Sequence, residues 1–384
     1  MANKRIYYAC HQAGIKADSD AGDAFTEIHG LQSASTTMNF QLEQVFELGQ
    51  LSIYQNIEQI PEVQVSLTKV LDGYPLMYLL ATKDALDPTL AGRSNAKSIF
   101  GMSIFADTAN SATGAPSSVV QCSGTFVGSV SYSFPVDGNF TEEMTLTGND
   151  RVWANASGYG DELSGDLPTP EFDGAFDGTD SPIGTGGVNR RQHLIFDYDS
   201  GDGLDVNGQV ADPDATILPL EVHGISASGT NEEVDGVKGA HLTNIGVQCN
   251  FNREALNELG RFGPYHRTVT FPVEVTCEIQ AISVSGDMVS GTEEGIYTTE
   301  AGQCNRQGNL QDRTIRIATC EGTRLYLGTK NKLQSVSYSG GDAGGGNVTT
   351  SFQYSTFNDL TVMHSGDPNE NYTWSGRATY LRDV

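Results

Sequence analysis

The chain has 384 residues, and its 48 acidic against 22 basic residues give a formal net charge of −26. Such a surface repels phosphate groups, which excludes a protein that grips nucleic acid by neutralising its backbone. The length is sufficient for two hydrophobic cores, and 44 glycines among abundant serine, threonine and valine favour a mainly β, turn-rich fold.

The first residues, MANKRIYYACHQAG, contain no apolar stretch of signal-peptide length, so we expect synthesis and assembly in a cytosol. Residues 5–15 predict a strand or an extended arm. The longest apolar run, Tyr74–Ala81, is far shorter than a membrane span, and as Tyr74–Thr82 it predicts a short helix over one mouth of the sheet. The cysteines lack CxxC and metal-ligand spacing, which favours reduced, mostly buried thiols. They are Cys10, Cys122, Cys249, Cys277, Cys304 and Cys320.

One motif occurs twice, 211 positions apart and without a gap. Asn39–Pro61 reads NFQLEQVFELGQLSIYQNIEQIP, and Asn250–Pro272 reads NFNREALNELGRFGPYHRTVTFP. Packing alone explains repeated apolar positions, and a turn inside an ordinary sandwich is the alternative. Charged residues repeated at fixed spacing indicate a shared contact between subunits. The residues assigned to this interface are Asn39, Phe40, Glu43, Glu47, Leu48, Gly49 and Tyr54, with Asn250, Phe251, Glu254, Glu258, Leu259, Gly260 and Tyr265.

The first copy of the motif predicts a strand followed by a short helix. Leu31–Phe40 has the composition of a strand. Leu42, Val45 and Phe46 then fall at i, i+3 and i+4, which predicts one or two helical turns, and Gly49 would close them in a left-handed conformation.

Apolar and polar residues alternate after each copy, which predicts strands with one buried and one wet face. Pro61 and Pro272 are expected to interrupt these strands at a bulge or an edge. The polar positions are Glu62, Gln64, Ser66 and Thr68 in the first strand, with Glu274, Thr276 and Glu278 in the second.

The second half of each module also repeats. The sequence SVSYS occurs at Ser129–Ser133 and at Ser335–Ser339, each time before a turn and an alternating strand, which is the pattern of a hairpin. Because the matches keep their order, we predict a duplicated β-sandwich or barrel module with a short helix in each copy. The predicted domains are 1–153, with the N-terminal arm, and 238–384, separated by an acidic Gly/Asp-rich insertion at 154–237.

The insertion carries the strongest metal-like signal. Asp197, Asp199, Asp202 and Asp205 stand close together among glycines, and such carboxylates can wrap Ca²⁺. Their spacing departs from the EF-hand pattern, so a solvated acidic turn is the favoured interpretation. Short strands are expected around His193–Phe196 and Ile217–Val222.

Nothing in the sequence marks a catalytic site. The glycine-rich stretches lack the strand–loop–helix context and the lysine of a phosphate cradle, the seven histidines show no paired spacing, and no GxSxG motif occurs. We therefore predict no catalytic residue, no cofactor and no enzymatic activity, with a hydrolase as the least favoured alternative.

Both copies resemble tail proteins of marine tailed phages, and the module of long hairpins plus a short helix is similar to the tail-tube fold. The resemblance spans roughly 28–150 and 238–384. It implies tube domains joined edge to edge into six-domain rings that stack into a conduit for DNA. The runs that carry it are Leu42–Gly49, Ile53–Tyr54, Asn250–Gly260, Gly263–Arg267 and Phe271–Val275.

For a duplicated chain, the resemblance implies three chains in each pseudo-sixfold ring, and a ring of six chains is the alternative. It implies a virion tail protein, assembled in the bacterial host cytoplasm, that contacts copies of itself and other tail proteins. DNA would only pass through it, and no membrane is involved. The polar strand faces listed above would then line the lumen, where an acidic wall repels phosphates. Gln41–Gln50 and Asn252–Arg261 would form the contacts between rings.

Two rival functions are also consistent with the sequence. A baseplate hub or tube initiator also places two tube domains on one chain, and its copy number in the virion would separate it from a tube subunit. A secreted, Ca²⁺-stabilised β-sandwich binding protein is the rival from another class. A melting temperature insensitive to chelators would exclude it.

Overall fold

The computed structural model describes residues 6–19, 25–85, 87–105, 116–155, 172–173, 187–191, 194–198, 241–261, 263–282, 315–319, 323–340 and 346–364. The fold is mainly β, as predicted, and its large sheet is antiparallel apart from one short parallel pair and does not close into a barrel. In this part of the chain, no helix is long and apolar enough to cross a membrane.

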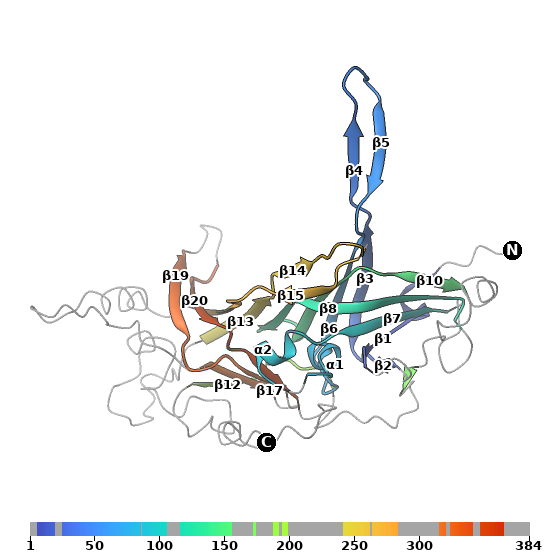
Figure 1. Cartoon of the computed structure of the whole chain (residues 1–384). Helices are drawn as coiled ribbons and strands as arrows, with labels where there is room; N and C mark the ends of the chain where they lie inside the picture. Colours follow the sequence, from blue (N-terminus) through green and yellow to red (C-terminus); the bar gives the residue numbers. More distant parts are fainter. Residues whose placement is uncertain are drawn as a thin grey trace, which may run out of the picture.

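The first module contributes four antiparallel strands in the order β3-β6-β9-β8. The second contributes four in the equivalent order β13-β16-β20-β19. The two sets join where β8 pairs with β13, which makes one continuous eight-stranded sheet (Figure 1). The strands are β3 (Leu31–Asn39), β6 (Glu62–Val70), β8 (Ser118–Pro135), β9 (Thr141–Gly148), β13 (His241–Asn250), β16 (Glu274–Ile282), β19 (Lys332–Ser339) and β20 (Thr349–Phe357).

The two four-stranded sheets also share the positions of their register shifts. The register of β3 shifts between Leu31 and Ser33, and that of β13 shifts 211 positions later, between Leu242 and Asn244. β8 shifts between Val127 and Ser129, and β19 shifts 206 positions later, between Leu333 and Ser335. A β-bulge is a built feature of a strand rather than a random defect, so these repeated shifts fix which residues of the two sheets correspond.

The gap-free repeat needs one correction. Met38 pairs with Val63, whereas its counterpart Cys249 pairs with Val275, so β16 is offset by 212 positions rather than 211. With this offset the buried faces agree, since one residue of slip would exchange the two faces of a strand. Pro61 and Pro272 lie just before β6 and β16 and do not interrupt them, because a residue without an N–H fits a strand start better than its interior.

The prediction of helical turns at Leu42–Phe46 is wrong. This stretch is β4 (Leu42–Phe46), which pairs with β5 (Ile53–Glu58), and the second copy forms β14 (Arg253–Leu256) and β15 (His266–Val269) in the same way. Pairing with a partner strand outweighs the i, i+3, i+4 spacing of three apolar residues. Gly49 does adopt the predicted left-handed conformation, with φ of 95°, in the loop of the hairpin.

The predicted apolar helix is present as α1 (Met77–Ala81), and all five of its residues are buried. It packs against β1, β8, β9 and β21. A second helix, α2 (Leu90–Arg93), also belongs to the first module. The described part of the second module contains no helix, so the expectation of one in each module is not met there.

The remaining elements surround the long sheet. β11-β2-β1-β7 extend it beyond the first half of β8, which also pairs with β10, and β12-β17-β18-β21 form a separate small sheet. The strand expected around His193–Phe196 is β12, while Ile217–Val222 lies outside the described residues. The bounds are η1 (Tyr8–Cys10), β1 (His11–Ala17), β2 (Phe25–Glu27), β7 (Ser98–Ile104), β10 (Val152–Asn155), β11 (Phe172–Asp173), β12 (Leu194–Tyr198), β17 (Ile315–Thr319), β18 (Arg324–Tyr326) and β21 (Thr361–Met363).

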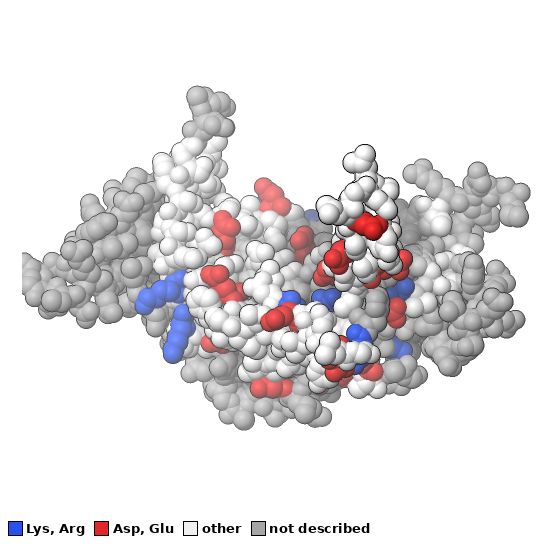
Figure 2. Space-filling view, turned by 45° about the horizontal axis from the view of Figure 1, so that its top comes forward, with Lys and Arg blue, Asp and Glu red and all other residues white. Residues whose placement is uncertain are grey.

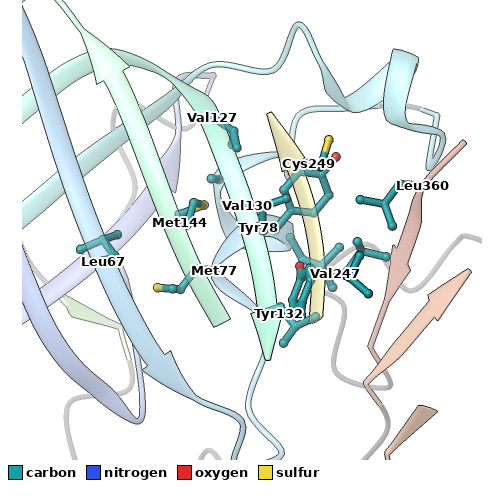
Figure 3. Close-up of a cluster of buried hydrophobic side chains, with 14 of the residues drawn as sticks. Leu67, Met77, Tyr78, Val127, Val130, Tyr132, Met144, Val247, Cys249 and Leu360 are labelled. Carbon is teal, nitrogen blue, oxygen red and sulfur yellow. The ribbon is translucent and has the colours of Figure 1, made fainter. Parts of the chain in front are cut away.

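One hydrophobic cluster runs beneath both halves of the sheet. The predicted alternation is confirmed from Glu62 to Thr68 in β6 and from Glu274 to Gln280 in β16, where the apolar residues are buried and their polar neighbours are half-buried or exposed. Figure 3 shows Met77 and Tyr78 of α1 among side chains of β8, β9 and β13. Cys10, Cys122, Cys249 and Cys277 are buried free thiols, as expected, and the other two cysteines lie outside the described residues.

Candidate assembly interfaces

The joint between β8 and β13 shows how one module meets another. Seven residue pairs are in register, from Asn244 opposite Pro135 to Asn250 opposite Ser129. Six apolar side chains along the joint are each at most 2% exposed. They are Val130, Tyr132 and Phe134 from β8, and Ile245, Val247 and Cys249 from β13.

Phe251 continues this joint just beyond the end of β13. Its backbone N–H donates a 2.9 Å hydrogen bond to the carbonyl oxygen of Gly128, in the bulge of β8. Its side chain is 0% exposed and stacks with Tyr78 at 6.3 Å between ring centroids. The second module therefore places an aromatic anchor in the core of the first.

Arg253 ties the β14–β15 hairpin to the first module. Its guanidinium donates hydrogen bonds to the carbonyl oxygens of Val127 (2.6 Å) and Ser94 (2.7 Å), and to that of Arg267 in its own hairpin (3.1 Å). Burial lowers the pKa of Arg253 to about 10, which still leaves it charged at neutral pH. The fork of the guanidinium suits several acceptors at once.

Arg267 adds a second tie. Its Nε donates to Asn149 Oδ1 at 3.1 Å, and its guanidinium lies 3.7 Å from the carboxylate of Glu62. Asn149 in turn donates from Nδ2 to the carbonyl oxygen of Pro61 at 2.9 Å. The β14–β15 hairpin therefore lies along the body of the protein (Figure 1).

The β4–β5 hairpin behaves differently and projects from the sheet as an isolated arm (Figure 1). Its residues are exposed apart from Val45, which is half-buried. Several of them are large and apolar, a composition that a solvated arm does not need. The exposed apolar side chains of this arm and its base are Phe40, Leu42, Phe46, Leu48, Leu51, Ile53, Tyr54 and Ile57.

Both copies of the motif begin with the same turn. Asn39 Oδ1 accepts a 3.1 Å hydrogen bond from the backbone N–H of Gln41, and Asn250 Oδ1 accepts one of 3.1 Å from Asn252. Gln41 and Asn252 have φ of 40° and 42°, in the left-handed region that residues other than glycine rarely adopt. The asparagines assigned to an interface thus shape the base of each hairpin.

The other predicted interface residues lie on two separate hairpins that are not brought together. Glu43, Glu47, Leu48, Gly49 and Tyr54 are exposed on the free arm. Their counterparts in the second copy are also exposed, and Glu258 forms a 3.5 Å ion pair with Arg261 at the surface. Their role between subunits stays a prediction.

Sequence reasoning missed Arg253 and Arg267, although the repeat contains a signal for one of them. The counterpart of Arg253 is the exposed Leu42, so this is a place where the two copies differ in charge. The difference coincides with the different settings of the hairpins, one pinned to the body and one free.

The predicted lumen residues share the face of the sheet opposite α1, and under the 212 offset Glu62, Gln64 and Ser66 correspond to Glu274, Thr276 and Glu278. Thr68 extends the series along β6. Figure 2 shows acidic side chains scattered over the side of the molecule from which the free hairpin rises.

Glu278 is fixed on this face by its neighbours. Ser351 Oγ donates to its carboxylate at 2.6 Å and Gln280 Nε2 donates at 2.9 Å, and these hydrogen bonds hold the pKa of Glu278 below its usual value. Its negative charge therefore persists to lower pH than that of a free glutamate.

The two outer edges of the eight-stranded sheet are β3 and β19, and neither pairs with a further strand among the described residues. Both are half-buried to exposed along their length. Unpaired edges of this length offer N–H and C=O groups to another chain.

No group of three or more possible metal ligands occurs in the described residues. Asp197 lies in β12, and the other members of the Ca²⁺ candidate, Asp199, Asp202 and Asp205, lie outside the described residues.

No family model and no curated protein matches the chain. Among solved structures, it is similar to the tube-terminating cap of the anti-feeding prophage, with TM-score 0.31 and 15% identity over 41% of this chain and 95% of that chain. It is similar to the sheath/tube terminator of PVC, an extracellular contractile injection system, with TM-score 0.30 and 13% identity over 40% and 99%. A chain of the anti-feeding prophage baseplate gives TM-score 0.29 and 10% identity over 41% and 99%.

Proposed function

We propose that this chain is a structural tail-tube subunit of a tailed phage, with two tube modules (1–153 and 238–384) separated by an insertion (154–237). The observation that carries the proposal is the strand order. Two four-stranded sheets of equivalent order meet edge to edge at β8 and β13, and the outer edges β3 and β19 pair with no further strand in the described part of the chain. Closing a ring removes open edges without a further partner.

Three chains complete such a ring with approximate sixfold symmetry. A barrel of about 24 strands, at a spacing of about 4.8 Å and the usual tilt, has a diameter of roughly 48 Å between backbones. Barrels of about 16–18 strands already leave an aqueous channel. A ring of three chains therefore has room for a DNA duplex after its side chains are added.

The two faces of the sheet suit this arrangement. The apolar face is covered by α1 and the small sheet, and the opposite face carries Glu62, Glu274 and Glu278 among serines, threonines and glutamines. We place this polar face on the lumen, where negative charge prevents phosphates from sticking. The apolar arm β4–β5 then reaches the adjacent ring and accounts for stacking.

The test is electron microscopy in negative stain, together with light scattering, on the purified full-length chain. We expect rings with a central hole, a mass of three chains for each ring, and rods at higher concentration. Single rings that never extend into rods would favour a hub or initiator over a tube subunit. A monomer throughout the micromolar range would overturn the proposal.

A further inference from the structure

We infer that β3 of one chain pairs with β19 of a second copy in the register of the internal β8–β13 joint, and that Phe40 takes on that copy the place that Phe251 takes within the chain. This inference rests on the proposed ring and specifies its joint.

The correspondence of the strands supplies the register. The repeated bulges match β3 to β13 at an offset of 211 and β8 to β19 at an offset of 206. The internal joint pairs Gln248 with Ser131 and Cys249 with Val130. Transferred to the open edges, these pairs become Thr37 with Ser337 and Met38 with Val336 of the neighbouring copy.

Exposure supports the same pairing. Tyr132 is 1% exposed at the internal joint, while its counterpart Tyr338 is 53% exposed on β19. Phe251 is 0% exposed, while its counterpart Phe40 is 57% exposed. Exposed aromatic side chains do not stabilise a strand edge that faces only water. A joint between two copies that resembles the β8–β13 joint would bury both Tyr338 and Phe40.

The anchor has a defined acceptor. Phe251 N–H donates to the carbonyl oxygen of Gly128, the residue that the bulge of β8 leaves out of the β8–β9 pairing. The counterpart of Gly128 is Gln334, which the bulge of β19 leaves out of the β19–β20 pairing. We therefore assign the hydrogen bond from Phe40 N–H to the backbone carbonyl of Gln334 in the second copy.

This joint is directional, since a β3 edge meets a β19 edge. It differs from a symmetric dimer in which β3 pairs with β3 or β19 with β19, because such a dimer would use up identical edges and could not grow into a ring. The two arrangements place different residues opposite one another.

Disulfide trapping distinguishes them. The double variant Thr37→Cys with Ser337→Cys places both thiols on exposed positions of one cross-strand pair, with Cβ atoms about 4.5–5.5 Å apart, close to disulfide range. On mild oxidation of the assembled full-length protein we expect a ladder of covalent dimers and trimers. The single variants and the unchanged chain, oxidised in parallel, control for native cysteines.

A register-shifted double variant, Thr37→Cys with Ser335→Cys, is the matched comparison. Trapping at least ten-fold more efficient for the first pair supports the inference. If rings form but the shifted pair gives more disulfide-linked oligomer, or if only the single variants become cross-linked, the proposed register is overturned. The ring proposal itself would still stand. Absence of any oligomer overturns both.

Phe40→Ser tests the anchor. Because Phe40 is exposed in the single chain, the melting temperature should stay unchanged while the concentration needed for ring formation rises at least ten-fold. Phe357→Ser removes a ring of similar exposure (55%) at the end of β20, which is not an edge strand, and should leave ring formation unchanged. Equal effects of the two variants would overturn the role of Phe40.

Discussion

Glu142 Oε2 accepts a 2.7 Å hydrogen bond from the backbone N–H of Met77, although 65 positions separate the two residues. The same carboxylate accepts from Tyr78 N–H at 3.0 Å and from the Tyr132 hydroxyl at 3.1 Å. Glu142 is completely buried, and burial raises its pKa. The carboxylate thus fastens α1, which covers the apolar face, to β9.

Removing this carboxylate should loosen the helix from the sheet. We expect Glu142→Ala to lower the free energy of unfolding by about 3–5 kcal/mol, because it leaves a cavity and several buried donors without an acceptor. Glu142→Gln, which keeps one acceptor oxygen, should lose less. Glu143→Ala, on the opposite, exposed face of β9, is the control and should change it by less than about 1 kcal/mol. Urea unfolding measures all three, and equal losses for Glu142 and Glu143 variants would contradict the fastening.

Arg253 should matter far more than a surface arginine of the same hairpin. Arg253→Ala leaves three backbone carbonyl oxygens without their donor and should cost about 2–4 kcal/mol. Arg253→Lys should recover only part, since an ammonium lacks the planar fork. Arg261→Ala breaks an exposed ion pair and should cost at most about 1 kcal/mol. Hydrogen exchange of β14 and β15 would report the loosening directly, and unchanged protection in Arg253→Ala would refute it.

Because His364 is buried, we expect the folded protein to lose stability in mild acid. Burial, followed by Lys69 and Arg324, lowers its pKa from 6.5 to about 4. The unfolded chain therefore takes up a proton below pH 6.5 while the folded chain does not, so stability falls as the pH drops from 6.5 to 4. The contribution reaches about 3 kcal/mol. In His364→Asn this part of the pH dependence should vanish. Unfolding curves of both proteins between pH 4 and 7 test this, and parallel pH profiles would argue against it.

Local patterns predicted the strands well and their partners poorly. Alternation around Val63 and Val275 marks a buried face, which is a property of a few adjacent residues. Leu42–Phe46 has helical spacing, but its conformation is decided by pairing with β5. The joint of β8 and β13 unites segments far apart in the chain, and no local signal specifies it. Residues shared by the two copies do not reveal Arg253, because its counterpart in the first copy is the uncharged Leu42.

The free arm should govern stacking alone. Leu48 is fully exposed at the tip of the β4–β5 hairpin, so Leu48→Asp should leave folding and ring formation intact and prevent rods. The reason is the cost of placing a charge in an apolar contact between rings. Val188→Asp, a charge added at a half-exposed site off the arm, controls for net charge. Rods of normal length from Leu48→Asp in negative stain would remove the stacking role.

The charge of the polar face should decide whether DNA slides or sticks. In Glu274→Lys with Glu278→Lys, two repelling groups become attracting ones on the proposed lumen, while both side chains stay off the apolar core. We expect tubes to form, but to retain duplex DNA in a salt-dependent manner and to slow genome delivery, since lysines displace the counterions of phosphates. Asp87→Lys with Asp137→Lys makes the same change of charge at exposed sites outside the polar face and the free arm. Retention that depends only on net charge, equal in both double variants, would show that the polar face does not meet the DNA.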